Sequence, residues 1–113
     1  MNIAIESLDT LIEDIDGEAL PLATPGDILL EEFMEPFDLS ANALARDLHV
    51  PPNRITAILR GQRAITADTA LRLARYFGTT AEFWLNMQAD FELRQARRDK
   101  AHKIEDEVNP RAA

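Results

Sequence analysis

Side chains suited to the edges of DNA bases are concentrated in one short stretch of the chain. Asn can make two hydrogen bonds to adenine, Arg can make two to guanine, and a Thr or Ala methyl group can contact the thymine methyl. Arg side chains at the end of the stretch suit phosphates, which add affinity without sequence preference. The predicted base contacts are Asn53, Arg54, Thr56 and Ala57, and the predicted phosphate contacts are Ser40, Arg60 and Arg63.

Two short helices joined by a tight turn would bring these side chains to DNA. Ser40 is a good N-cap for a helix over residues 41–48, and Pro51 and Pro52 can open a second helix that ends at Gly61. This is the layout of a helix-turn-helix, whose second helix enters the major groove. The apolar residues that a helical wheel places on the inner face of the second helix are Ile55, Ile58 and Leu59.

Three further helices are predicted around this pair. Thr24, Thr66 and Thr80 can cap helices that begin at residues 25, 67 and 81, and Gly78 is expected to end the second of these. No segment shows the alternation of apolar and polar residues that marks a strand between turns. We therefore expect an all-α fold of five helices.

Large apolar side chains recur at helical spacing in the last predicted helix. Such a stripe is usually core, but five short helices cannot bury every apolar residue of a long final helix. We predict that part of it forms a symmetric dimer interface, which two DNA half-sites one turn apart also require. The predicted dimerisation residues are Phe83, Trp84, Met87 and Phe91.

Charge is distributed unevenly over the 113 residues, whose net charge is −8. Residues 1–39 hold eleven carboxylates and no Lys or Arg, whereas residues 40–77 hold six Arg and two Asp. A basic middle between acidic flanks suggests one anionic and one cationic partner. The expected organisation is an acidic N-terminal extension (1–23), a helix-turn-helix domain with a C-terminal dimerisation helix (24–99) and a charged, frayed tail (100–113).

The residue inventory argues against catalysis. The chain has no Cys, two His and two Ser, and it lacks a phosphate-binding glycine loop and metal-ligand spacing. We therefore predict a protein that is not an enzyme and uses no cofactor and no metal. No apolar run approaches the roughly 20 residues of a membrane span, and the first 20 residues lack the positive charge of a signal peptide. The expected location is cytoplasmic, with no membrane contact.

Several motifs resemble a known family. The run from Leu39 to Arg63 resembles the helix-turn-helix of the lambda-repressor-like superfamily. Thr-Pro-Gly-Asp-Ile-Leu at residues 24–29, the run at 65–74 and Glu-Phe-Trp-Leu-Asn-Met-Gln at 82–88 resemble the HigA-type antitoxins. The likeness covers about residues 24–95. It implies a homodimer that binds a palindromic double-stranded DNA operator, represses its own toxin-antitoxin operon and neutralises a RelE/HigB-like toxin that cleaves messenger RNA.

Two features bear on how far that resemblance extends. Ala41 stands where related domains often carry a Gln that steadies a phosphate contact, so we expect fewer direct contacts. The acidic extension lies outside the likeness. Because such toxins are small and basic, we predict that the extension, with the outer face of the first helix, contacts the toxin. The residues predicted to do so are Ile5, Leu8, Leu11, Ile12 and Ile15.

Two other functions stay open from the sequence. One is a solitary helix-turn-helix transcriptional regulator with no toxin. The other is a protein-interaction module that kept the fold and lost DNA binding, for which the isoelectric point of about 4.6 is the best support. The polar residues Asn53, Arg54 and Thr56 favour DNA binding, since an interaction module has no need of base-reading side chains.

Overall fold

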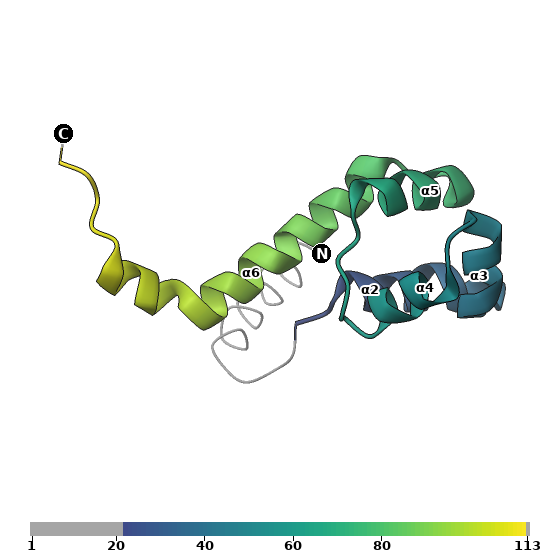
Figure 1. Ribbon diagram of the computed structural model, residues 1–113, viewed down its shortest axis with the longest axis horizontal. Coiled ribbons are helices and arrows are strands. Elements are labelled where there is room, and N and C mark those ends of the chain that lie inside the picture. Colours follow the sequence, from purple (N-terminus) through teal and green to yellow (C-terminus); the bar gives the residue numbers. More distant parts are fainter. Residues whose placement is uncertain (1–21, 113) are drawn as a thin grey trace, which may run out of the picture. The chain divides into compact units, whose positions relative to one another are not determined.

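The computed structural model describes residues 22–112, and these form helices and connecting segments without a strand (Figure 1). The first three segments follow one another without a gap, so they make one continuous helical stretch. The described part therefore has the predicted all-α, five-helix architecture. The segments are α2 (Pro25–Ile28), the π-helical η1 (Leu29–Met34), the 3-10 helix η2 (Glu35–Phe37), α3 (Ala41–Leu48), α4 (Pro52–Leu59), α5 (Ala67–Phe77) and α6 (Ala81–Glu107).

Short polar side chains cap three of the helices as the sequence predicts, whereas Thr66 stands at the start of α5 without a side-chain cap hydrogen bond. The Thr24 hydroxyl accepts a hydrogen bond from the Asp27 amide at 3.0 Å, and the Asp27 carboxylate accepts one from the Thr24 amide at 2.9 Å. This reciprocal pair satisfies two backbone donors that a helix start would otherwise leave free. Ser40 caps α3 through the Ala43 amide at 3.1 Å, and Thr80 caps α6 in the same way.

Left-handed residues end four of the helical stretches. Gly61 and Gly78 have φ of 73° and 76° and follow α4 and α5, as predicted for both glycines. His49 ends α3 with φ of 58°, and Asp38 ends η2 with φ of 54°. These two turns set the directions in which α3 and α4 enter the domain.

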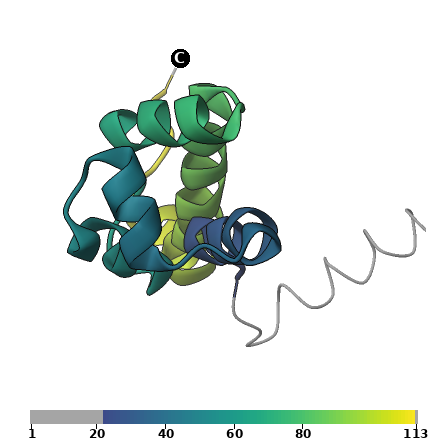
Figure 2. The ribbon, with the colours of Figure 1, turned by 90° about the vertical axis from the view of Figure 1, so that its right-hand side faces the viewer.

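Residues 23–95 form one compact unit with a common apolar core. Figure 2 shows its helices arranged around this interior, and α4 packs against both α2 and α3. Gly26 lies where α2 crosses α4, and a Cβ atom there would stand 2.1 Å from the Ile58 carbonyl oxygen. The largest fully buried side chains include Leu29, Met34, Leu44, Ile55, Ile58, Ile65, Leu73 and Trp84.

Helix α6 continues to Glu107, beyond the position near Lys100 where the sequence predicted fraying. The residues past Lys100 are rich in side chains that favour helices, and that preference accounts for the continuation. Residues 96–112 belong to a second unit, in which Ile104 and Val108 are exposed apolar side chains. In the described range, no helix combines the length and the apolar composition that crossing a membrane requires.

Candidate nucleic-acid interface

Helix α4 presents a polar edge at the surface because its apolar residues are used in the core. Ile55 and Ile58 are buried, as the helical wheel predicts, and they hold α4 against α2 and α3. Asn53 is exposed in the first turn, whereas Thr56 and Ala57 are half-buried. The Thr56 hydroxyl donates to the backbone carbonyl of Asn53 at 3.3 Å.

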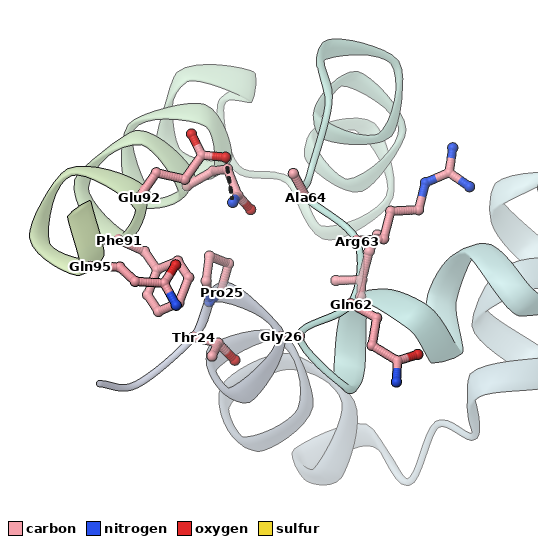
Figure 3. Close-up of a pocket in the computed structure, with 12 residues that line it drawn as sticks. Thr24, Pro25, Gly26, Gln62, Arg63, Ala64, Phe91, Glu92 and Gln95 are labelled. Carbon is pink, nitrogen blue, oxygen red and sulfur yellow. Dashed lines mark hydrogen bonds between the residues drawn. The ribbon is translucent and has the colours of Figure 1, made fainter. Parts of the chain in front are cut away.

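The three predicted phosphate contacts are all exposed. Ser40 lies at the N-terminus of α3, where backbone N–H groups and the helix dipole favour an anion. Arg60 and Arg63 follow α4, on the loop that leads to α5. Arg63 lies beside a small pocket with a volume of about 180 Å³, and Figure 3 shows its side chain pointing away from that pocket.

Arg54 does not project outward as the sequence predicts. Its Nη1 atom donates to the Asp68 carboxylate on α5 at 2.7 Å, and only 23% of its side chain is exposed. Its Nε atom is buried and makes no hydrogen bond within the described residues. The helical wheel places Arg54 on the outer edge of α4, but the ion pair bends the side chain toward α5.

Asp68 connects Arg54 to a second arginine. Arg72 Nε donates to the same carboxylate oxygen at 3.0 Å, and Arg72 Nη1 donates to the Leu48 carbonyl at 2.9 Å. The hydrogen bond from Arg72, followed by that from Arg54, lowers the pKa of Asp68 from its ordinary value. The spacing of four residues between Asp68 and Arg72 could have indicated their pairing. The contact with Arg54, 14 residues away, depends on how α4 packs beside α5.

Trp84 is a core residue rather than a surface residue of the last helix. Its side chain has no exposed area, and its Nε1 atom donates to the Thr79 hydroxyl at 2.7 Å. The indole packs in tilted geometry against the rings of Phe33 and Phe77 and edge-on against that of Phe83, at centroid distances of 4.8, 6.4 and 5.0 Å. The prediction that Trp84 lies in a dimer interface is therefore wrong, because its own domain already buries it.

The other three residues of the predicted dimer stripe are partly accessible. Phe83 is 41% exposed, and Met87 is half-buried against the core. Phe91 is half-buried and lies beside Pro25 at the pocket shown in Figure 3. The exposed apolar surface of α6 within the compact unit thus belongs mainly to Phe83 and Leu93, the latter 51% exposed.

The predicted toxin contacts Ile5, Leu8, Leu11, Ile12 and Ile15 lie outside the described residues. The outer face of the first helical stretch is described. Glu31, Glu32 and Glu35 are exposed there, and Phe37, at its end, is 67% exposed. This face is therefore acidic, with one large apolar side chain beside the carboxylates.

The chain is similar to known proteins both in sequence and in structure. The helix-turn-helix family HTH_3 matches residues 30–84. Virulence-associated protein I of Dichelobacter nodosus is 58% identical over 81 residues, which make up 72% of this chain and 75% of that protein. The structure of an addiction module antidote protein of a HigA family from Coxiella burnetii is 52% identical, with a TM-score of 0.75, and covers 81% of this chain and 100% of that one. The chain belongs to the HigA family of helix-turn-helix proteins.

A second HigA structure is also similar to this chain. The Pseudomonas aeruginosa antitoxin HigA, solved with the higBA promoter, is 44% identical to this chain and has a TM-score of 0.75. The match covers 80% of this chain and 98% of that one. The HigA resemblance inferred from the sequence motifs is confirmed, and so is the helix-turn-helix fold.

Proposed function

We propose that this HigA-family chain is a homodimeric, sequence-specific repressor of its own toxin-antitoxin operon, located in the cytoplasm, and that it neutralises a small basic RelE/HigB-like toxin. The observation that carries the DNA-binding part is the exposed polar edge of α4, flanked by Ser40 before α3 and by Arg60 and Arg63 after α4. The P. aeruginosa relative solved with promoter DNA supports the same reading.

On DNA, α4 would lie in the major groove as the recognition helix. The amide of Asn53 suits an adenine, and the half-buried methyl groups of Thr56 and Ala57 can contact a thymine methyl. Arg60 and Arg63 would hold phosphates and set the salt dependence of binding. These roles divide the interface into a short base-reading segment and a basic segment after it.

A dimer would place two such helices in successive major grooves. Half-sites one helical turn apart require two copies related by a two-fold axis, and the operator is then palindromic. Phe83 and Leu93, the exposed large apolar side chains of α6 within the compact unit, favour this role. Trp84 would support it only indirectly, by fixing the position of Phe83.

The negative charge of a second surface, on the first helical stretch, favours a basic protein partner there. The first helical stretch and its flanks, residues 24–39, carry five carboxylates and no Lys or Arg, and the preceding residues are also acidic. A basic toxin would be attracted to this end of the chain, whereas DNA would be repelled from it. The two partners would therefore use different surfaces.

Two measurements test the proposal. The first is selection of duplexes from a random DNA library by the 113-residue chain, which should enrich a palindrome with half-sites about one turn apart. The second is affinity purification from the native host at near-physiological salt, with intact-mass analysis. A small basic protein retained in a fixed ratio supports the antitoxin role. A homodimer that retains only DNA fragments supports a solitary regulator, and retention of neither supports an interaction module.

A further inference from the structure

Arg54, Asp68 and Arg72 link the recognition helix to the helices that support it. Asp68 Oδ2 accepts from Arg54 Nη1 at 2.7 Å and from Arg72 Nε at 3.0 Å. Arg72 also donates to the carbonyl of Leu48, the last residue of α3. One carboxylate oxygen on α5 thus holds the arginine of α4, and a second arginine holds that carboxylate to α3. The position of Arg54 is determined by this network.

Asp68 holds one end of the Arg54 guanidinium in this arrangement. Nη1 takes part in the ion pair, and Nε is buried without an acceptor in the described part of the chain. A guanine presents two acceptors, O6 and N7, which an arginine matches with two neighbouring donors. Three N–H groups of Arg54, one on Nη1 and two on Nη2, remain for a ligand. Only 23% of the side chain is exposed, so we expect the guanidinium to move away from Asp68 before it meets both acceptors of a base edge.

Breaking the ion pair between Arg54 and Asp68 costs free energy, and the new partner of Arg54 decides how much of that cost is offset. The carboxylate would keep Arg72 but lose Arg54, and it would lie beside the negative charge of DNA. A single phosphate contact exchanges one ionic partner for another and leaves this repulsion in place. A guanine edge adds a second hydrogen bond, and each such bidentate pair discriminates strongly between bases. A penalty that only one partner overcomes is a source of specificity.

We propose that Asp68 is a specificity-determining residue, which restrains Arg54 from the phosphates of unrelated DNA and releases it to a site that offers a guanine edge. The inference rests on the proposed DNA binding, and it assigns to α5 a role in sequence discrimination. Asp68 itself does not contact a base. It acts by setting the cost of moving Arg54.

The variant Asp68→Asn tests this role because it keeps the size of the side chain and removes its charge. Affinities are measured for the selected operator duplex and for a scrambled duplex of the same length and composition, across a range of salt concentrations. The scrambled duplex should bind at least about five-fold more tightly, and the log–log salt slope should steepen by about one, since one more cation is free for phosphates. The operator should gain less, so that the ratio of the two affinities falls.

Removal of a carboxylate could strengthen DNA binding through its charge alone, so the same change is made in an Arg54→Ala chain. There, Asp68→Asn should alter the scrambled affinity by less than about two-fold, because the residue to be released is absent. Asp68→Glu in the original chain should restore most of the discrimination. An equal gain with and without Arg54 would overturn the proposal.

A measurement without DNA separates this inference from the proposed function. The buried Nε–H of Arg54 should exchange slowly with solvent, and Asp68→Asn should speed its exchange at least about ten-fold, as followed by 15N NMR. Unchanged exchange would show that Asp68 does not restrain Arg54. If the unaltered chain binds the operator and Asp68→Asn leaves scrambled affinity unchanged, the role of Asp68 alone fails. If no duplex binds either protein, DNA binding fails, and the role of Asp68 with it.

Discussion

Asn53 and Arg63 differ in what their loss should do to DNA binding. Asn53→Ala should weaken operator binding by about 1–3 kcal/mol, roughly 5- to 150-fold, and leave unrelated DNA almost unaffected, because a base contact carries sequence information. Arg63→Ala should weaken all sequences alike and reduce the salt slope by about one. Fluorescence anisotropy with operator and scrambled duplexes measures both. Equal losses on every sequence for Asn53→Ala would make it a backbone contact.

The ion pairs of Asp68 also predict how stability depends on pH. The pKa of Asp68 is lowered in the folded chain by Arg72 and Arg54, so its carboxylate contributes stability above the pKa of the unfolded state, about 3.9. That contribution is lost as the pH falls through the lower folded value. The unfolding midpoint of Asp68→Asn should therefore approach that of the unaltered chain at acidic pH. Denaturant titrations between neutral pH and about pH 3 measure it. A constant difference across this range would contradict the pairing.

The crossing of α2 and α4 depends on the absence of a side chain at Gly26. A Cβ atom would stand 2.1 Å from the Ile58 carbonyl oxygen, and the atoms it meets are backbone, which cannot rotate away. Gly26→Ala should therefore lower the free energy of unfolding by about 3 kcal/mol. Because Ile58 is in α4, the variant should also reduce operator affinity by shifting the recognition helix.

Gly78→Ala is the matched control for this prediction. Gly78 has φ of 76° but no heavy atom within 4 Å of a Cβ, so the change brings backbone strain without a clash. We expect a loss of about 1 kcal/mol and unaltered DNA affinity. Thermal unfolding of both variants decides the point. Comparable losses would mean that α2 and α4 adjust to the added methyl group.

Along α6, buried side chains stabilise the fold of one copy, and exposed apolar side chains are expected to hold two copies together. Trp84→Phe removes the donor to Thr79 from a fully buried site and should lower stability by at least about 1 kcal/mol while a dimer persists. Phe83→Ser, at a side chain that is 41% exposed, should favour the monomer. Sedimentation velocity together with thermal unfolding distinguishes these effects. A monomeric Trp84→Phe protein of unaltered stability would contradict the assignment of Trp84 to the core.

Local signals in the sequence were sufficient for most of the helical layout. Thr24 with Asp27, Ser40, and Thr80 begin helices, and Gly78 ends one, because capping and left-handed turns are decided by neighbouring residues. The spacing of apolar residues along α4 identified Ile55 and Ile58 as core for a similar reason. Periodicity within one helix reports which face is apolar, and the motifs placed the chain in its family.

Contacts between helices could not be derived in that way. Arg54 lies on the outer edge of α4 by periodicity, yet Asp68, 14 residues further on, binds it once α4 and α5 are packed. Trp84 belongs to an apolar stripe in the sequence, and only the rings of Phe33 and Phe77 from other helices show that it is buried. A residue's own helix decides its direction, but the surrounding helices decide what fills the space in that direction. The helix face on which each residue lies was therefore set by local sequence, and the final orientation and partner of its side chain by the tertiary packing.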